Sequence, residues 1–322
     1  MTLVVPSVVI RPQCILHWLI AFVTFAVQTG ARIKSFYVST VCIIPTALQM
    51  LRITSVYGIG HAEEQNARFR KTMEDATVMI DKFGNNPNLG YFAVFDGHGG
   101  PEASKTAAES VHKIIMENIL NHNLDNAEID LSGSLRTPKL TNDSQIDIDN
   151  LKDYEAIFRK SIEEADQYMK NRGHIYVGCT ACICFVSKQY FTLINIGDSR
   201  AVMSNKGVAQ RLTNDHKAAE KSEQERIKQS GGGIIMGRVN GFLSVSRALG
   251  DWCLKHLVIS KPDIFRYPRE SSAEFIIIAC DGIWDVVNDQ QAVDVVKKSL
   301  KESGSPQRAA AELKNVALRL GT

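Results

Sequence analysis

The sequence predicts a globular domain that mixes α-helices and β-strands and begins near Val56 in a chain of 322 residues. Hydrophobic residues make up 44% of the chain, which is enough to bury a substantial core. Some segments carry apolar residues every three or four positions, and others are short, continuous apolar runs. The first pattern is typical of amphipathic helices and the second of strands that are buried on both faces.

Three segments have the helical pattern. One follows Pro101, and a second contains Ile157 and Phe158. The third begins at Ser305 and Pro306, a capping residue followed by proline at the first helical position. The apolar positions behind these predictions are Ala103, Ala107, Val111, Ile114, Ile115 and Ile119 in the first helix, Ile157, Phe158, Ile162, Ala165 and Met169 in the second, and Ala309, Ala310, Leu313, Val316, Ala317 and Leu320 in the third.

Three short runs, residues 91–95, 191–196 and 275–280, are rich in aromatic and β-branched residues and are predicted to be buried strands. Residues 76–80 are a fourth candidate. Residues 121–150, between the first two helices, are rich in Asn, Asp, Ser and Thr and have no sustained apolar period. We therefore expect a polar surface loop inserted into the domain.

The first part of the chain has a different composition, since residues 1–62 contain no Asp or Glu. We assign residues 1–55 to an atypical hydrophobic N-terminal extension and residues 56–322 to the main domain. Residues 13–31 lack charged side chains and are borderline in length for a membrane anchor. Residues 35–51 are a second uncharged run, interrupted by Pro45, and the lack of acidic residues with scattered Arg and Ser also resembles an organellar presequence. A poorly ordered segment, or one absent from the mature protein, is the alternative that we favour.

The formal net charge is +2, from 37 basic and 35 acidic side chains, which disfavours a polybasic nucleic-acid-binding protein. Seven cysteines in a chain of this length do not form a disulfide framework. Cys179, Cys182 and Cys184 lie close together in the sequence, but no second Cys or His pair is spaced to complete a zinc site. We expect packed, reduced thiols.

Acidic residues border the predicted strands. Asp96, Asp198 and Asp281 follow the ends of three strands, and Glu74 and Asp75 precede residues 76–80. Each acidic residue alone is consistent with a turn or a cap. Neighbouring strands, however, would gather carboxylates that repel one another unless cations neutralise them. Oxygen ligands without Cys or His suit Mg²⁺ or Mn²⁺.

Two such cations that share one carboxylate lower the pKa of a bridging water and hold a phosphoryl oxygen beside it, which is hydrolase chemistry. His98, two residues after Asp96, is placed to protonate a leaving group. Arg70 offers two parallel donors to a phosphate dianion. Considered in isolation, His98 would be a solvent-facing loop histidine and Arg70 an ordinary surface arginine.

A series of motifs resembles, in order, the signature blocks of the metal-dependent type 2C Ser/Thr protein phosphatases, and the chain looks most like the small fungal members. The resemblance runs from about Val56 to the C-terminus. The motifs are Arg70-Lys71-Thr72-Met73-Glu74-Asp75, Phe92-Ala93-Val94-Phe95-Asp96-Gly97-His98-Gly99-Gly100, Gly178-Cys179-Thr180-Ala181, Gly197-Asp198-Ser199-Arg200-Ala201, Asp215-His216-Lys217, Arg238-Val239-Asn240-Gly241, Ser246-Arg247-Ala248-Leu249-Gly250-Asp251 and Ala279-Cys280-Asp281-Gly282-Ile283-Trp284-Asp285-Val286.

The resemblance implies an α+β fold, a four-layer α-β-β-α sandwich of two antiparallel sheets flanked by helix pairs, with metals in a cleft at one end. It implies that Asp96 bridges two Mg²⁺ or Mn²⁺ ions, that the Gly97 carbonyl binds one of them and that Asp281 binds the other. Glu74 and Asp75 would stand near the metals, directly or through water.

By the same resemblance, Arg70 holds the substrate phosphate and His98 is the general acid. Asp198 and Asp285, together with Asp281, match a third and weaker metal position. Residues 215–240 correspond to a flap beside the cleft that helps to choose substrates.

Family members continue past the position of Gly321 and Thr322 into an Asp-Asn pair and a last strand, and this Asp is another metal ligand. We expect the main domain to be C-terminally truncated and to lack both features. Loss of the strand would leave neighbouring backbone groups unpaired. With the atypical first residues, the expectation is a chain altered at both ends.

The implied function is hydrolysis of phosphoserine and phosphothreonine on proteins by a metal-activated water, without a phosphoenzyme, in kinase signalling. The alternative is a phosphatase-like binding protein with weak or no turnover, because the Asp-Asn motif is absent. The implied partners are phosphorylated proteins, stress-activated protein kinases among them, and not nucleic acid. We expect a monomer in the cytoplasm and nucleus, with membrane anchoring through residues 13–31 as the alternative.

Overall fold

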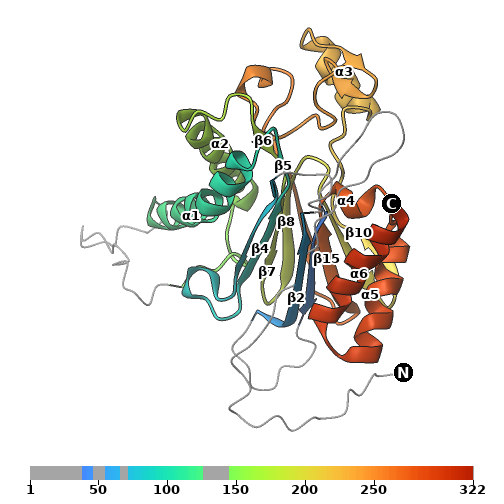
Figure 1. Cartoon of the computed structure of the whole chain (residues 1–322). Coiled ribbons are helices and arrows are strands. Elements are labelled where there is room, and N and C mark those ends of the chain that lie inside the picture. Colours follow the sequence, from blue (N-terminus) through green and yellow to red (C-terminus); the bar gives the residue numbers. More distant parts are fainter. Residues whose placement is uncertain (1–37, 46–54, 66–71, 126–144, 322) are drawn as a thin grey trace, which may run out of the picture.

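The computed structural model describes residues 38–45, 55–65, 72–125 and 145–321. Two five-stranded sheets pack face to face at its centre, and helices cover both outer faces (Figure 1). Neighbouring strands within each of these sheets are antiparallel. The expected four-layer α-β-β-α sandwich is therefore confirmed.

The first sheet has the strand order β10-β9-β15-β1-β2. Its central strand, β15, contains most of the run predicted at residues 275–280 and pairs with β9 on one side and β1 on the other. The strand bounds are β10 Val208–Arg211, β9 Arg200–Asn205, β15 Ala273–Ala279, β1 Val38–Pro45 and β2 Val56–Glu64.

The second sheet has the strand order β14-β8-β7-β4-β3. Its strands β4, β8 and β3 match the predicted runs at residues 91–95, 191–196 and 76–80. Every residue of β4 and β7 is buried, because one face meets the first sheet and the other meets helices. The bounds are β14 Asp263–Pro268, β8 Tyr190–Ile196, β7 Ala181–Val186, β4 Gly90–Phe95 and β3 Ala76–Ile80.

The three predicted helices are present as α1 (Glu102–Asp125), α2 (Tyr154–Asn171) and α6 (Pro306–Gly321). The pair α1 and α2 covers the second sheet, and α6 with α5 (Asp289–Ser303) covers the first (Figure 1). The Ser305 hydroxyl accepts a hydrogen bond from the Arg308 amide at 3.3 Å, so it caps α6 as the sequence predicts.

The hydrophobic core has two main layers. One fills the space between the sheets and beneath α5 and α6, and the other lies beneath α1 and α2. In the second layer the Phe158 and Phe185 rings stack with centroids 5.3 Å apart, and Tyr91 meets Phe185 edge-on at 5.2 Å. These large buried rings hold the helix pair against the sheet.

A smaller unit, residues 217–246, stands at one end of the sandwich and has its own apolar centre around Ile227, Val239 and Val245 (Figure 1). We call this unit the flap, and it contains α3 (Lys221–Gln229), β11 (Ile234–Ile235) and β12 (Arg238–Val239). The other short elements are β5 (Gly97–His98), β6 (Gly178–Cys179), β13 (Leu249–Gly250), α4 (Asp281–Trp284) and the 3₁₀ turns η2 (Phe83–Asn85) and η3 (Trp252–Leu254).

The boundary at residues 55/56 stays a prediction, and strand β1 lies on its N-terminal side. This strand belongs to the expected extension but pairs with β15 from Thr40↔Ala279 to Ile43↔Ile276, and also with β2 along its whole length. Residues 41–44 are apolar and mostly β-branched, which suits a strand in the middle of a sheet. Because β15 is paired along both edges, the expected unpaired backbone groups are not found beside it.

The polar insertion expected at residues 121–150 stays a prediction, and the structure describes only its two ends. Helix α1 continues to Asp125, and Ile146 and Ile148 are 1% exposed within the layer beneath the helices. The alternation Ile-Asp-Ile places both isoleucines on one side of an extended segment, too short a pattern to stand out in the sequence. Across the described ranges no helix is long and apolar enough to cross a bilayer, and residues 13–31 lie outside them.

Candidate metal centre

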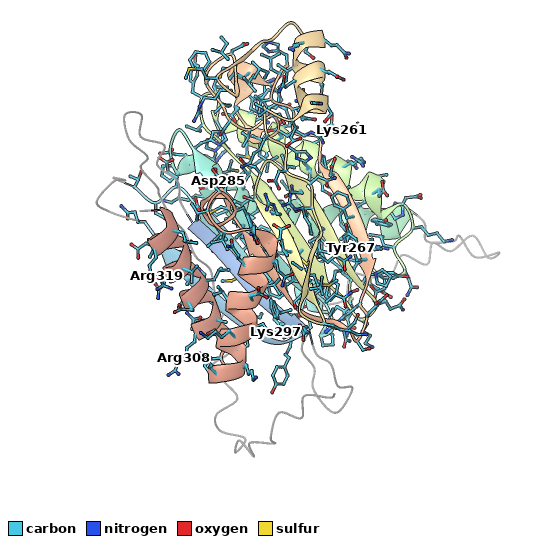
Figure 2. All side chains as sticks on the ribbon, turned by 90° about the vertical axis from the view of Figure 1, so that its right-hand side faces the viewer. Lys261, Tyr267, Asp285, Lys297, Arg308 and Arg319 are labelled. Carbon is cyan, nitrogen blue, oxygen red and sulfur yellow. The ribbon has the colours of Figure 1, made fainter. Side chains whose placement is uncertain are left out.

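Asp96 and Asp281 come from opposite sheets and meet at one end of the sandwich. Asp96 directly follows β4, and Asp281 begins α4 after β15. One carboxylate oxygen from each, with the Cys280 sulfur, lies within 4.8 Å of the others. In Figure 2 Asp285, at the end of α4, lies at the flap end of the sandwich, whereas Lys297 and Arg308 lie lower along α5 and α6.

Two further buried carboxylates face this pair. Asp75 precedes β3 and is 6% exposed, and Asp198 follows β8 and is 2% exposed. Burial raises the pKa of Asp96 well above its usual value, and the charges of Asp75, Asp281 and Asp198 raise it further. Burial likewise raises the pKa of Asp281, and the charges of Asp198 and Asp285 add to that rise. The cluster therefore stores electrostatic repulsion that a cation would relieve.

The donor chemistry of this cluster fits hard divalent cations. Its side chains offer carboxylate oxygens, which Mg²⁺ and Mn²⁺ prefer, and the uncompensated charge is strongly negative. The Cys280 thiol is a softer neighbour, and burial raises its pKa well above the usual thiol value. It therefore stands beside the oxygen ligands as a neutral group.

Gly97 lets the segment before β3 approach the end of β4. A side-chain carbon at Gly97 would lie 2.2 Å from the Glu74 carbonyl oxygen, so this position accepts no larger residue without a shift. The Ser104 hydroxyl, at the start of α1, donates to the same carbonyl. Glu74 and Asp75 are thus held beside Asp96 through the backbone of residue 74.

His98 is paired with an acidic residue that is distant in the sequence. Its Nε2 lies 2.6 Å from Asp251 Oδ2, and the Asp251 side chain is 4% exposed. Burial by itself lowers the pKa of His98, but the charge and hydrogen bond of Asp251 outweigh burial, so the pKa is raised. A side-chain carbon at Gly178 would meet both partners, at 2.1 Å and 2.6 Å, so a glycine there makes room for the pair.

Among the described residues, Lys217 is the basic side chain that forms ion pairs with this acidic end. Its Nζ donates to Asp285 Oδ1 at 2.7 Å and lies 4.0 Å from Asp198 Oδ2. Burial lowers the pKa of Lys217, but the charges of Asp198, Asp285 and Asp281 outweigh burial and raise it. The ammonium therefore neutralises part of the acidic cluster.

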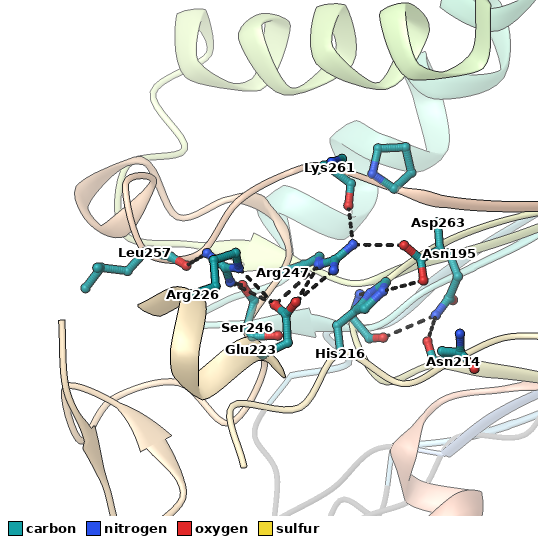
Figure 3. A network of polar contacts seen from close by, with 12 residues as sticks. Asn195, Asn214, His216, Glu223, Arg226, Ser246, Arg247, Leu257, Lys261 and Asp263 are labelled. Carbon is teal, nitrogen blue, oxygen red and sulfur yellow. Dashed lines mark hydrogen bonds and ion pairs between the residues drawn. The ribbon is translucent and has the colours of Figure 1, made fainter. Parts of the chain in front are cut away.

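A network of ion pairs and hydrogen bonds ties the flap to the sandwich (Figure 3). Glu223 in α3 accepts hydrogen bonds from Arg226 at 2.8 Å and from Arg247 at 2.7 Å. Arg247 also donates to Asp263 at 3.0 Å, at the start of β14. His216 Nε2 lies 3.3 Å from the other Asp263 oxygen. These contacts fix the chain on both sides of the cleft-facing lysine.

The structure brings most of the predicted site residues together, although their roles stay predictions. The cluster contains Asp75, Asp96, Asp198, Asp281 and Asp285, with Gly97, Glu74 and His98 beside it. Arg70 lies outside the described residues.

Two partners within the site, Asp251 and Lys217, were not predicted from the sequence, although both lie in motifs that the sequence shows. Asp251 pairs with His98, and Lys217 pairs with Asp285. The signal in the sequence was that a charged residue, Asp251 or Lys217, ends each of these motifs. The expected packed, reduced thiols are confirmed for Cys179, Cys182 and Cys184, which are free and buried.

Comparison with known proteins gives consistent similarities. Residues 59–322 match the family model described as protein phosphatase 2C. Protein phosphatase 2C homolog 1 of Saccharomyces cerevisiae is 36% identical over 284 residues, covering 83% of this chain and 90% of that protein. Its namesake in Schizosaccharomyces pombe is 34% identical over 271 residues, covering 81% and 68%. The crystal structure of serine-threonine phosphatase 2C from Toxoplasma gondii has a TM-score of 0.61 at 19% identity and covers 92% of each chain, which supports the fold.

Proposed function

This chain belongs to the protein phosphatase 2C family and is a metal-dependent protein-serine/threonine phosphatase, and from that premise we propose how its cleft acts. Asp96 and Asp281 hold two divalent cations, Mg²⁺ or Mn²⁺, with the Gly97 carbonyl as a further ligand. Glu74 and Asp75 stand behind them. Asp198 and Asp285, together with Asp281, would provide a third, weaker position. The observation that carries this proposal is the convergence of the Asp96 and Asp281 carboxylates from opposite sheets.

The chain's own residues have separate tasks in the proposed reaction. When bound, the cations supply a water made nucleophilic at neutral pH and neutralise phosphoryl charge. Arg70 holds the phosphate dianion by paired donors. His98 gives a proton to the departing seryl or threonyl oxygen. Because Nε2 faces Asp251 at 2.6 Å, Nδ1 is the nitrogen from which that proton leaves.

The raised pKa of His98 supports its role as the acid. A raised pKa favours the protonated imidazole, which is the form that a general acid requires. The Asp251 carboxylate also fixes the direction of the ring. Direct transfer to water leaves no phosphoenzyme, so we expect none to accumulate.

The substrates are phosphorylated proteins, and we propose that protein kinases switched on by phosphorylation, including stress-activated kinases, are among them. We further propose a monomer that acts in the cytoplasm and nucleus. Attachment to membranes through residues 13–31 is the alternative location. Sedimentation with membranes that survives an alkaline wash would establish that alternative, and release into the wash would exclude it.

The test is an assay of the purified full chain on a phosphothreonine peptide, with Mn²⁺ and with a chelator. We expect turnover with Mn²⁺, loss of turnover with chelator, and a drop of at least about 100-fold in Asp96→Asn. Asp294→Asn is the matched control, because Asp294 is exposed on α5 and away from the cluster. Full activity in chelator or in Asp96→Asn would overturn the proposal.

The same assay decides the alternative function, a protein that binds phosphorylated partners with little or no turnover. Under that alternative, phosphopeptide binds to the Mn²⁺-loaded protein and no phosphate is released at millimolar Mn²⁺. Release of phosphate under those conditions excludes it. Measuring peptide binding by fluorescence anisotropy beside phosphate release separates the two functions in one preparation.

A further inference from the structure

The ammonium of Lys217 lies beside Asp285 and Asp198, two of the three carboxylates assigned above to the weaker metal position. Nζ donates to Asp285 Oδ1 at 2.7 Å and lies 4.0 Å from Asp198 Oδ2. We propose that Lys217 is a tethered cation that competes with the third divalent ion for Asp198 and Asp285, and so sets the affinity of that position. The inference rests on the proposed function for the identity of this position.

The backbone around Lys217 holds its side chain in this direction. The His216 amide donates to the Gly197 carbonyl at 2.9 Å, and the Gly197 amide donates back to His216 Nδ1 at 3.1 Å. On the other side, the Ala218 amide donates to the Ser244 carbonyl at 2.7 Å, and the backbone of Lys217 forms an isolated antiparallel β-bridge with Val245. These backbone contacts therefore fix the Cα position of Lys217 at the base of the flap.

Burial makes the contact stronger than an ordinary surface ion pair. The Asp198 side chain is 3% exposed, while those of Lys217 and Asp285 are 30% and 28% exposed. A carboxylate as buried as Asp198 is weakly screened by solvent, so a nearby positive charge stabilises it more than the same charge would at the surface. Lys217 supplies that charge in the absence of a bound ion.

An ammonium group and a divalent cation cannot share this place. Both would take the Asp285 oxygen at short range, and two positive charges so close would repel each other. The third ion therefore binds only when the Lys217 side chain moves away from Asp285. Displacing the ammonium costs free energy and so lowers the affinity of the third ion, whereas no ion pair among the described residues joins a basic side chain to Asp96 or Asp281.

The experiment counts bound Mn²⁺ by calorimetry and by the electron paramagnetic resonance signal of free Mn²⁺, on the full chain. In Lys217→Met, which keeps the apolar stem and removes the charge, we expect the weakest binding event to tighten about tenfold. The tighter events should shift much less, because Lys217 forms no ion pair with Asp96 or Asp281 among the described residues. Lys217→Arg keeps the charge and should retain the weak affinity of the wild type.

Two further variants make the result specific to this position. Lys221→Met removes an exposed positive charge from the same flap and should leave every Mn²⁺ affinity unchanged. Adding Asp285→Asn to Lys217→Met should abolish the gain, because the third ion then loses a ligand. An unchanged third affinity in Lys217→Met, or equal tightening of all sites, would overturn the inference.

A role for Lys217 in gripping substrate phosphate predicts a different pattern. Lys217→Met would then weaken the binding of inorganic phosphate and leave the Mn²⁺ affinities as they are, which also contradicts the inference. The readouts separate it from the proposed function. If the wild type hydrolyses the phosphopeptide but Lys217→Met leaves the affinity of the third Mn²⁺ unchanged, only the competition is refuted. If Lys217→Met tightens the third Mn²⁺ but the wild type hydrolyses no phosphopeptide, only the phosphatase proposal is refuted.

Discussion

Glu223 provides the sharpest test of how the flap is fastened to the sandwich. Its carboxylate is 4% exposed and receives hydrogen bonds from Arg226 and Arg247. Burial alone raises the pKa of Glu223, but the hydrogen bonds from the two arginines outweigh burial and lower it from 4.5 to about 2. The perturbation is Glu223→Gln, which keeps the shape and removes the charge.

The size of the effect follows from this shift. A depression from 4.5 to about 2 corresponds to about 3 kcal/mol of folding free energy at neutral pH. The Arg226 and Arg247 side chains are 24% and 15% exposed, so solvent screening reduces the expected loss to about 2 kcal/mol. Because the pKa is lower in the folded state, this stabilisation is present above pH 4.5 and is lost as the pH falls towards 2.

The assay is urea unfolding of wild type, Glu223→Gln and Glu225→Gln at pH 7, 4 and 3. Glu225 is an exposed residue of the same helix and serves as the matched control. At pH 7 we expect Glu223→Gln to be about 2 kcal/mol less stable, and we expect the difference to narrow at pH 3, where the wild-type carboxyl is increasingly protonated. Equal losses in the two variants at pH 7, or a difference independent of pH, would refute the reasoning.

Two other predictions concern the catalytic histidine and the helix layer. Asp251→Asn removes the charge that raises the pKa of His98, so the alkaline limb of the pH–rate profile should move to lower pH and kcat should fall about tenfold to 100-fold, with unchanged Mn²⁺ affinity. An alkaline limb that stays in place would contradict this. Gly60→Ala places a carbon 2.1 Å from the Pro306 backbone and should destabilise the fold by about 3 kcal/mol. In thermal unfolding, Gly233→Ala, whose added carbon has no neighbour nearer than 3.8 Å, should remain close to wild type.

The elements that could be predicted from the sequence are those with a clear local pattern of apolar and polar residues. The strands β4, β8 and β15 are continuous apolar runs, and the acidic residues that follow them are visible as breaks in those runs. Amphipathic spacing located α2 and α6 in the same way. Helix α5 was not predicted, although its capping box at Asn288 and Gln291 is a recognisable start signal.

The features that could not be predicted depend on contacts between distant residues. His98 and Asp251 meet because β5, β6 and β13 pair, and no local pattern in either segment specifies that register. Strand β1 pairs with β15, which lies more than 200 residues later in the sequence, so no local pattern shows that β1 joins this sheet. Lys217 faces Asp285 because the flap network fixes its backbone, which composition and spacing do not reveal.

The position of β1 has a consequence for synthesis on the ribosome. In the first sheet β2 pairs with β1, and β1 pairs with β15. Thr40 can therefore pair with Ala279 only after almost the whole chain has been synthesised, and the first sheet is incomplete until then. Such distant pairing slows folding, because a long loop must be closed before the contacts stabilise the product. During translation the hairpin of β1 and β2 exposes an open edge for most of the time that the chain is growing. Nascent chains should therefore depend on chaperones until β15 has emerged.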